Sequence, residues 1–452
     1  MSAMRGAARP GRRLLAFPGQ HPRAASALQV GQRDRLSKTH LRAMRHLSAL
    51  AHRGRSLSTV AFRSTTSKAL DCSDPKLAFS SYSTFELLRG ATVLTACSQP
   101  WLVKHSEPLL ALSDRVLGRK ATEALLRHSV FAHFVAGETA ETIAPTLRGL
   151  REQGVGGILD YAAEADLESE GGADVTVNQP ARSYPYVSEA QCDANHRIFM
   201  AAVDAVHATT PEGFAAVKVT ALGDPALLER VSTAVRELRA FFEALDPAKQ
   251  GVISRDAFRR GWRESFEVSD EEIEAVFERI DADMDGDVDL VEFTNALPLQ
   301  AIGPLVQRCR SKGPLYRSAL DVDECAALER MLARLDEIAL RAKALGVRLM
   351  IDAEHTYFQP AIDHAVLRLS RAHNREYPVV FGTYQAYLRE CDAKLRLDLD
   401  RAHREGWHLG AKLVRGAYMV HERQRAAELG YPDPIHPTVG STLATLSATE
   451  CH

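Results

Sequence analysis

Five short apolar runs, separated by helical segments, constrain the fold of this chain more than any other feature. Each run is apolar on both faces, which is typical of strands covered by helices on both sides. The segments between them have apolar residues at the spacing of three and four that indicates amphipathic helices. Strands that alternate with helices predict an α/β fold with a parallel sheet. The runs span residues 155–161, 214–222, 347–354, 377–385 and 409–418.

Polar side chains stand at or near the ends of these runs. In a parallel α/β barrel, functional side chains gather at the carboxyl ends of the strands, which predicts a site there. A purely structural interpretation weighs about equally, because a strand end must meet water somewhere. The residues concerned are Asp160, Lys218, Asp352, Glu354, Gln385, Arg415 and Tyr418.

The first 70 residues differ from the rest of the chain in charge. Up to residue 65 there are twelve arginines and a single acidic residue, Asp34. An arginine-rich, serine-containing and acid-poor segment is typical of a mitochondrial transit peptide. A disordered basic arm and an artefact of the gene model are the alternatives. We predict import into mitochondria and leave residues 1–70 out of the fold.

The remaining chain divides into a helical segment, two parts of the α/β domain, an insertion and a tail. A formal net charge of −2 gives no reason to expect a nucleic-acid partner. No apolar stretch approaches the length that spans a bilayer, so we expect no transmembrane segment, although contact with a membrane surface stays open. The predicted boundaries are 71–150 for the helical segment, 151–236 and 301–438 for the α/β parts, 237–300 for the insertion and 439–452 for a divergent tail.

The insertion contains the most acidic stretch of the chain, "DADMDGDVDLVE" at residues 281–292. Its spacing matches the EF-hand calcium loop, in which oxygen ligands stand at positions 1, 3, 5, 7, 9 and 12 and a glycine stands at position 6. Gly286 occupies the glycine position. A solvated acidic loop is the alternative. The predicted Ca²⁺ ligands are Asp281, Asp283, Asp285, Asp287, Asp289 and Glu292.

A second loop with the same skeleton lies upstream at residues 246–257. Asp246 and Gly251 occupy positions 1 and 6, but Ala248 and Ala257 replace the oxygen ligands at positions 3 and 12. We expect this loop to fold as the partner of the first, with Ile253 paired to Val288, and to bind calcium weakly or not at all. The two loops together predict an all-α EF-hand pair inserted into the α/β domain.

Four further segments carry a family resemblance. They are "FAHFVAGE", "GGILDY", "DAEHTYFQPAI" and "KLVRGAY", within a stretch from about Thr84 to Thr438 that the insertion interrupts. This stretch closely resembles the mitochondrial proline dehydrogenase family. The resemblance implies a (β/α)8 TIM-type barrel that binds FAD and oxidises L-proline to 1-pyrroline-5-carboxylate. Electrons would pass to a quinone at the inner mitochondrial membrane, on its matrix side.

The resemblance also implies a role for particular residues. Lys218 would hold the carboxylate of the substrate, Asp352 would orient its neighbours at the floor of the site, and Tyr418 would pack over the substrate. Gln385 would offer its amide to the flavin, and Lys412 would lie beside flavin N5, where a positive charge stabilises the reduced ring. The residues that would line the flavin are Leu413, Val414, Arg415, Gly416 and Ala417.

The resemblance ends after Thr438, when five strand–helix units have passed. Five parallel strands cannot close a barrel of eight, so we expect an incomplete barrel in a C-terminally truncated chain with impaired proline oxidation. Two other functions stay open. One is hydroxyproline dehydrogenase, although "DAEHTYFQPAI" resembles the proline enzyme more closely, and the other is a catalytically inert remnant that binds calcium.

Overall fold

The structure is a computed structural model. It describes residues 74–80, 82–137, 139–160, 165–166, 182–183, 186–210, 213–297, 299 and 302–450. The predicted transit segment, residues 1–70, lies outside the described residues. The chain separates into two compact units, Met1–Ser80 and Ser81–His452. The short helix α2 (Pro75–Ala78) belongs to the first unit, and every other element below belongs to the second.

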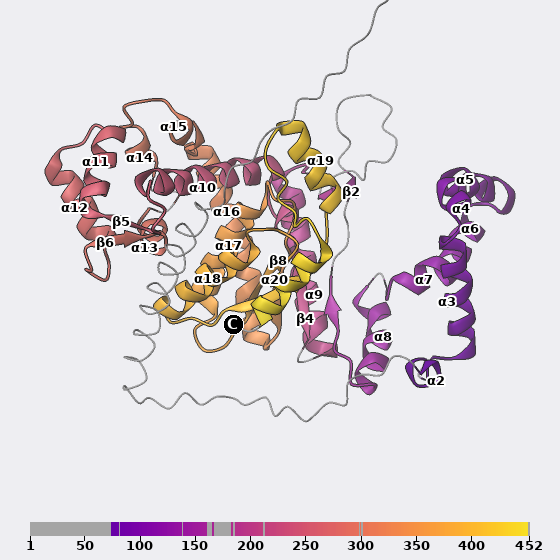
Figure 1. Ribbon diagram of the computed structural model, residues 1–452. Helices are drawn as coiled ribbons and strands as arrows, with labels where there is room; N and C mark the ends of the chain where they lie inside the picture. The colour runs from indigo at the N-terminus through magenta and orange to yellow at the C-terminus, as the bar shows by residue number, and fades with distance from the viewer. Residues whose placement is uncertain are drawn as a thin grey trace, which may run out of the picture. The chain divides into compact units, whose positions relative to one another are not determined.

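Five parallel strands form the main sheet of the second unit, which confirms the predicted α/β fold with a parallel sheet (Figure 1). Their order in the sheet is β1-β4-β7-β8-β9, which is also their order along the chain. Two short antiparallel pairs, β2–β3 (Ala165–Asp166 with Arg182–Ser183) and β5–β6 (Val252–Ser254 with Asp287–Asp289), lie apart from it. The five bounds are β1 Ile158–Leu159, β4 Phe214–Val217, β7 Arg348–Ile351, β8 Val380–Gln385 and β9 Gly410–Val414.

One face of this sheet is sealed by helices. Successive residues of a strand point to opposite faces, so the side chains on each face can be assigned from the register. On β4, β7 and the start of β8, the apolar residues of the sealed face are at most 1% exposed and belong to the main hydrophobic cluster, in which each large side chain contributes roughly 1.5–3 kcal/mol by its burial. They include Ala215, Val217, Leu349, Ile351 and Val380.

The opposite face is only partly covered. Phe214 and Phe381 lie on it, both half-buried, with their ring centroids 5.4 Å apart in an edge-to-face contact. A Cβ atom at Gly410 would lie 2.9 Å from Cγ of Phe381, so the next strand needs a glycine at that position. This half-open face carries the polar residues of the candidate site at its carboxyl edge.

The helices of the α/β part follow the strands, as the sequence predicts. In Figure 1, α16 and α17 lie side by side along the sheet, and they contact each other. The longest helix, α16, begins after Asp321, which accepts a hydrogen bond from the Glu324 N–H, and ends at Gly346 with φ of 69°. The bounds are α9 Glu189–Thr209, α10 Pro225–Leu245, α16 Val322–Leu345, α17 Gln359–His373, α18 Cys391–Glu405, α19 Met419–Leu429 and α20 Val439–Glu450.

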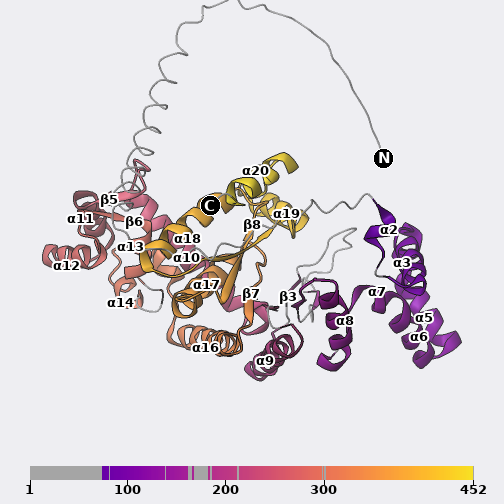
Figure 2. The same ribbon diagram turned by 90° about the horizontal axis from the view of Figure 1, so that it is seen from below.

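The inserted segment forms a helical group with its own core at the far end of α10, as both views show (Figures 1 and 2). Aromatic rings fill this core, and the rings of Phe258 and Trp262 stack with centroids 4.5 Å apart. The elements are β5 Val252–Ser254, α11 Arg255–Ser265, α12 Asp270–Ile280, β6 Asp287–Asp289, α13 Leu290–Ala296, α14 Gly303–Val306 and α15 Pro314–Ser318.

The boundary predicted between residues 236 and 237 falls inside a single continuous helix. α10 runs unbroken from Pro225 to Leu245, so it serves both as the helix that follows β4 and as the first helix of the insertion. Its N-terminal half packs in the main cluster through Leu228 and Val231, and its C-terminal half packs in the core of the insertion through Phe242. One rigid helix therefore connects the two cores.

The segment before the sheet is helical, as predicted. Several of its large apolar side chains are exposed, among them Phe85, Trp101 and Val116. No described helix is both long enough and apolar enough to cross a membrane. The bounds are α3 Thr84–Cys97, α4 Pro100–Lys104, α5 Ser106–Leu117, α6 Arg119–Leu126, the π-helical turn η1 Arg127–Phe131, α7 Ala132–Phe134 and α8 Ala140–Glu152.

The strands are shorter than the apolar runs that predict them. The run 214–222 leaves the sheet after Val217 and turns into a short 3-10 helix, η2 (Val219–Ala221). The run 347–354 ends as a strand at Ile351, so Glu354 lies in the loop that follows. Buried loop residues are as apolar as strand residues, and hydrophobicity alone therefore extends the prediction too far.

Candidate active site and cation loop

Polar residues of neighbouring strands lie at one level of the sheet. Val217 pairs with Ile351, Ile351 with Gly382, and Thr383 with Lys412. The residues one step further along β4 and β7 are Lys218 and Asp352. Parallel register therefore places Lys218, Asp352, Thr383 and Lys412 in one row on the half-open face, and we call these four residues the strand-end row.

An ion pair joins two members of the strand-end row. The Lys412 ammonium donates a hydrogen bond to Oδ1 of Asp352 at 2.6 Å, and both side chains are half-buried. Asp160, which follows β1, is within electrostatic range of the row. Partial burial raises the pKa of the Asp160 carboxyl, Lys218 and Lys412 lower it, and Asp352 raises it. The structure thus brings together three of the polar residues predicted at strand ends, Asp160, Lys218 and Asp352, with Lys412, which the family resemblance predicts beside them.

Glu354 is the most deeply buried acid near the row, with 1% of its surface exposed. Its carboxylate accepts hydrogen bonds from the Thr220 hydroxyl at 2.7 Å and from the Thr220 N–H at 3.2 Å. Burial raises the pKa of Glu354 to about 7, although the hydrogen bonds from Thr220 and the charge of Lys218 oppose the shift. This carboxyl group is therefore balanced between its two protonation states near neutral pH.

The amide of Gln385 is already engaged with this chain. Its Nε2 donates to the backbone carbonyl of Glu354 at 3.1 Å, and its Oε1 accepts from the Tyr387 hydroxyl. Gln385 is 4% exposed. The predicted contact between this amide and a flavin stays a prediction, and it would require the side chain to exchange at least one of these partners.

The run from Leu413 to Tyr418 leaves the sheet and enters α19. Arg415, Gly416 and Ala417 are exposed, and Val414 is half-buried on the same face as Lys412. The side chain of Leu413 points to the other face and packs with a small cluster that contains Tyr384 and Leu395. A contact between Leu413 and a flavin would therefore have to come from its backbone.

Tyr418 stands at the N-cap of α19 in the left-handed region, with φ of 49°. A non-glycine residue rarely adopts this conformation, and it turns the Tyr418 ring towards His355, with 4.3 Å between the ring centroids. The predicted substrate residue Tyr418 thus contacts the loop that follows β7.

Sequence reasoning missed a buried polar cluster beside Tyr418. The Glu422 carboxylate, 1% exposed, accepts a hydrogen bond from the Thr356 N–H at 2.8 Å and contacts Nδ1 of His355 at 3.3 Å. His421 packs against His355, with 4.6 Å between the ring centroids. Burial lowers the pKa of His421, and the charge of His355 lowers it further. The partners are more than 60 residues apart along the chain, so no local motif announces the cluster.

The acidic loop 281–292 is closed by its own backbone. Asp281 Oδ2 accepts from the Gly286 N–H at 3.2 Å, and Asp285 Oδ1 accepts from the Asp287 N–H at 2.9 Å. Glu292, at the end of the loop, accepts from the Ala282 N–H at 3.0 Å. One carboxylate oxygen from each of Asp281, Asp283 and Asp285 lies within 4.8 Å of the other two.

Burial is unfavourable for two carboxyl groups of this loop, those of Asp281 and Glu292. Asp281 is 5% exposed, and its buried Oδ1 atom has no hydrogen-bond partner among the described residues. Burial raises the pKa of Glu292, and the charges of Asp289 and Asp283 add to the shift. Oxygen atoms that converge in this way suit Ca²⁺, which prefers carboxylate and carbonyl ligands.

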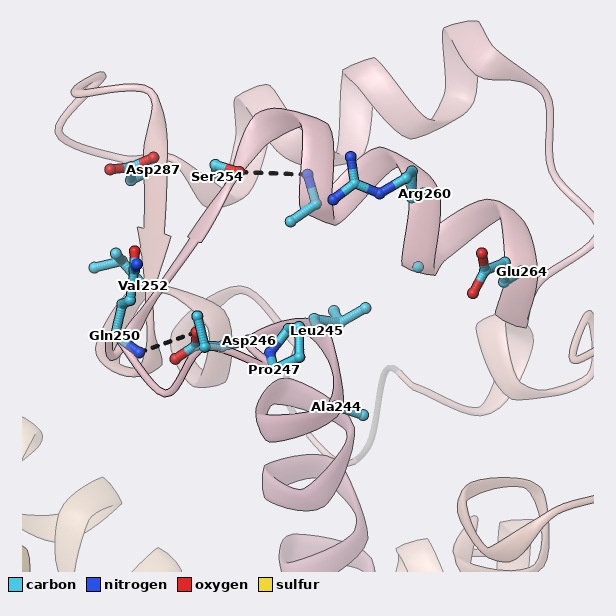
Figure 3. Close-up of a pocket in the computed structure, with 13 residues that line it drawn as sticks. Ala244, Leu245, Asp246, Pro247, Gln250, Val252, Ser254, Arg260, Glu264 and Asp287 are labelled. Carbon is cyan, nitrogen blue, oxygen red and sulfur yellow. Dashed lines mark hydrogen bonds between the residues drawn. The ribbon is translucent and has the colours of Figure 1, made fainter. Parts of the chain in front are cut away.

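The upstream loop has the same backbone and lacks most of the ligands. The predicted pairing of Ile253 with Val288 is confirmed, within the antiparallel pair β5–β6. Gly251 and Gly286 have φ of 82° and 90°, so each loop turns at its glycine. Figure 3 shows the cavity of about 350 Å³ beside the upstream loop, where Asp246 accepts a hydrogen bond from the Gln250 N–H at 3.0 Å.

Side chains connect the inserted helices to the α/β part. Arg404 of α18 donates a hydrogen bond to Oδ2 of Asp289, the residue at position 9 of the acidic loop. Asn295 of α13 donates to Glu405 of α18 at 2.8 Å, and Arg401 donates to the Thr294 hydroxyl at 3.0 Å. These hydrogen bonds hold the acidic loop and α13 against α18 of the α/β part.

A comparison with known protein families finds a match to the part of the chain that contains the main sheet. The family model described as Proline dehydrogenase matches residues 143–445. The match begins after the helical segment α3–α7 and continues past Thr438 into α20. This corrects our expectation that the resemblance ends at Thr438.

Relatives that align with most of this chain include proteins described as proline dehydrogenase and as hydroxyproline dehydrogenase. "Proline dehydrogenase 1, mitochondrial" from Homo sapiens is 35% identical over an aligned length of 423 residues, and the alignment covers 83% of this chain and 70% of the relative. The protein of that name from Caenorhabditis elegans is 36% identical and covers 82% of this chain and 69% of its own length. "Hydroxyproline dehydrogenase" from Xenopus laevis is 30% identical over 353 residues, 78% of this chain and 60% of the relative.

Among solved structures, the chain is similar to proline utilization A from Bdellovibrio bacteriovorus, crystallised after inactivation by N-propargylglycine. The sequence identity is 14% and the TM-score is 0.44, so the overall likeness is weak. The alignment covers 81% of this chain and 28% of that protein, which is therefore much longer than the region it shares with this one.

Proposed function

This chain belongs to the proline dehydrogenase family of oxidoreductases, and from that premise we propose that it binds FAD and oxidises L-proline to 1-pyrroline-5-carboxylate. The observation that carries the proposal is the strand-end row, in which two lysines and an aspartate face the half-open side of the sheet. A carboxylate substrate and an anionic reduced cofactor both require cations at such a place.

The residues at the carboxyl edge of the sheet fit a flavin. Residues 415–417 are exposed, so a ligand can approach their backbone. A Cβ atom at Gly416 would contact only the Met419 sulfur, at 3.3 Å. FAD, when bound, would supply the acceptor for the hydride that leaves the carbon beside the proline nitrogen. Lys412 would place its positive charge next to the ring, with Val414, Arg415, Gly416, Ala417 and the backbone of Leu413 along it, and Gln385 would turn its amide towards it.

The substrate would lie between the two lysines of the row. Lys218 would bind its carboxylate, because it is the second cation of the row and lies on the half-open face, on the strand next to the one that Asp352 follows. Asp352 would hold Lys412 in position through their 2.6 Å hydrogen bond. Tyr418 would close the site from the start of α19. The barrel would be of the (β/α)8 type.

We propose a mitochondrial location on the matrix side of the inner membrane, with a quinone as the electron acceptor. The names of the relatives from Homo sapiens and Caenorhabditis elegans, which include the word mitochondrial, support the location. The basic composition of the first 65 residues supports it independently.

We further propose that the acidic loop is the working half of an EF-hand pair and binds one Ca²⁺ ion. Asp281, Asp283, Asp285, Asp289 and Glu292 would coordinate through their side chains, and Asp287 through its backbone carbonyl. The partnerless, buried Oδ1 atom of Asp281 supports this assignment, because a buried carboxylate oxygen without a partner is unfavourable. The upstream loop would contribute its strand and its packing but no ion.

Anaerobic absorption spectra of the purified chain, loaded with FAD, test the enzymatic proposal. We expect L-proline to bleach the flavin faster than 4-hydroxy-L-proline does. Faster bleaching by hydroxyproline would assign the chain to the alternative substrate, which the lower identity to hydroxyproline dehydrogenases disfavours. If the chain retained no FAD and still bound calcium, the third alternative would hold, a catalytically inert remnant.

A further inference from the structure

A second group of metal-ligand side chains lies apart from the acidic loop, where the loop after β7 meets the first turn of α19. One ligand atom from each of His355, His421 and Glu422 lies within 4.8 Å of the other two. We propose that these three residues bind a divalent transition-metal ion such as Zn²⁺. Neither proline oxidation nor calcium binding requires this site.

Two buried nitrogen atoms in the cluster have no partner. His355 is 1% exposed, and its Nε2 atom accepts or donates no hydrogen bond among the described residues. The same holds for the buried Nδ1 atom of His421. A buried polar atom that loses water without gaining a partner costs roughly 1–3 kcal/mol. The unpartnered Nδ1 atom of His421, in a ring that touches His355, therefore indicates a missing partner, and a metal ion bound by Nδ1 of His355 and by Glu422 would supply it.

The spacing of His355 and Glu422 suits two ligands of one ion. Nδ1 of His355 lies 3.3 Å from Oε1 of Glu422. A hydrogen bond between a charged imidazole and a carboxylate is shorter, about 2.7–2.9 Å. In a tetrahedral zinc site with bonds of about 2.0–2.1 Å, adjacent ligand atoms are roughly 3.3 Å apart. The pair is thus held at the distance that separates neighbouring ligands.

Surrounding groups fix the orientation of the ligands. The Thr356 N–H donates to Oε1 of Glu422 at 2.8 Å, and the Thr356 hydroxyl donates to Oε2. The ring of Tyr357 stacks on His355, with 5.1 Å between the centroids and 11° between the planes. Such second contacts hold metal ligands in place and contribute to metal affinity.

The donor set selects the class of metal. Two imidazole nitrogens and one carboxylate oxygen suit zinc and its neighbours in the first transition row, whereas Ca²⁺ and Mg²⁺ prefer oxygen alone. The nearby cation Arg425 lies over the Tyr357 ring and pairs with Glu229 at 2.8 Å, so its charge is balanced without Glu422. Three protein ligands leave a fourth position for water or another small ligand.

A bound ion would connect parts of the chain that are distant in sequence. His355 belongs to the loop after β7, while His421 and Glu422 belong to α19, which begins at the left-handed residue Tyr418. The ion would hold the start of α19 against the carboxyl edge of the sheet. Because this contact is structural, its presence can be tested without measuring proline oxidation.

Zinc titration of the full chain in competition with a chromophoric chelator tests the site. Saturating Ca²⁺ would keep the acidic loop occupied. We expect one Zn²⁺ ion per chain, and His421→Gln should weaken its binding by about 100-fold or more, since even the loss of a supporting contact costs 10- to 100-fold. The matched control is His436→Gln, which changes a half-buried histidine that contacts Thr445 outside the cluster and should leave the affinity unchanged.

The absorption spectrum of the Co²⁺-loaded chain gives a second readout. We expect ligand-field bands typical of nitrogen and oxygen ligands, and their loss in His421→Gln. His355→Gln should act in the same way, and because His421 is only half-buried, its variant keeps the test open if the His355 variant fails to fold. The proposal is overturned if the chain binds no Zn²⁺ or if His421→Gln binds it as tightly as the unaltered protein.

Discussion

The strand-end row and the acidic loop differ in the partners that surround their aspartates. In the strand-end row, Asp352 accepts a hydrogen bond from Lys412, so the chain itself supplies the positive charge. In the acidic loop, the hydrogen bonds described for Asp281, Asp283 and Asp285 come from backbone N–H groups of the same loop. These bonds fix the direction of the carboxylates but leave their charge uncompensated.

The difference predicts which kind of ligand the strand-end row and the acidic loop each bind. A carboxylate that already has a lysine contributes to a site that can accept an anion, because the strand-end row contains two lysines and one aspartate. Converging carboxylates without a lysine require a cation from solution. Aspartate therefore belongs to a site for an anionic ligand in the strand-end row and to a site for a cation in the acidic loop. The difference is whether a lysine of the chain is paired with it.

The largest expected effect is the loss of calcium binding in Asp281→Asn. This change removes a charge from position 1 of the loop, where the unpartnered oxygen lies, and binding should fall below the range that calorimetry detects. The control is Asp246→Asn at position 1 of the upstream loop, which should still bind one ion. Two ions in the unaltered chain, or none lost in Asp281→Asn, would contradict the comparison.

The next effect concerns Glu354, the buried acid beside the strand-end row. Its pKa is about 7 in the folded chain and near 4.5 when unfolded, so the folded state holds the extra proton and stability falls as pH rises from about 4.5 to 7. Glu354→Gln should remove that loss and stabilise the protein at pH 8 by up to about 3 kcal/mol. Urea unfolding at pH 5 and pH 8 with EDTA present measures it; an equal pH dependence in both proteins would refute it.

A smaller effect should follow from breaking the ion pair of the strand-end row. Lys412→Met and Asp352→Asn each remove one partner of a half-buried hydrogen bond. In a double-mutant cycle we expect a coupling energy of about 1 kcal/mol in the free energy of unfolding. A coupling near zero would mean that the row is organised by the sheet alone and that the chain does not supply the counter-charge there.

The smallest effect should appear where the two regions meet. Arg404 holds Oδ2 of Asp289 and so competes with a bound ion for that carboxylate. Arg404→Ala should raise calcium affinity by about twofold, the equivalent of a weak surface ion pair. Calorimetry with Arg396→Ala as the control, an arginine paired within α18 itself, measures the change. A lower affinity in Arg404→Ala would show that the arginine orders the loop.

The parts of the fold that follow from periodicity could be predicted from the sequence. All five strands and the pairing of Ile253 with Val288 were accessible, because each depends on a local pattern or on a loop of fixed spacing. The strand ends were not, because whether Glu354 belongs to a strand depends on its neighbours across the sheet. The continuity of α10 was missed for a similar reason, since its apolar face serves two cores in succession.

The candidate sites divide along the same line. The acidic loop is a local motif, and its carboxylates converge within twelve residues. The pair of Lys412 with Asp352 spans 60 residues, and only the parallel register makes it a contact. The cluster of His355 and Glu422 spans 67 residues and was missed, because two separate single residues carry no signal until the fold joins them.

The most direct test of the central claim is an equilibrium titration of the full chain with FAD, followed by the quenching of flavin fluorescence. The claim is that the carboxyl edge of the sheet, from Lys218 to Gly416, forms a flavin site. We predict one FAD per chain, and loss of binding in Gly416→Leu, whose side chain would occupy the approach to the exposed run 415–417. No binding by the unaltered chain, or equal binding by both proteins, would contradict it.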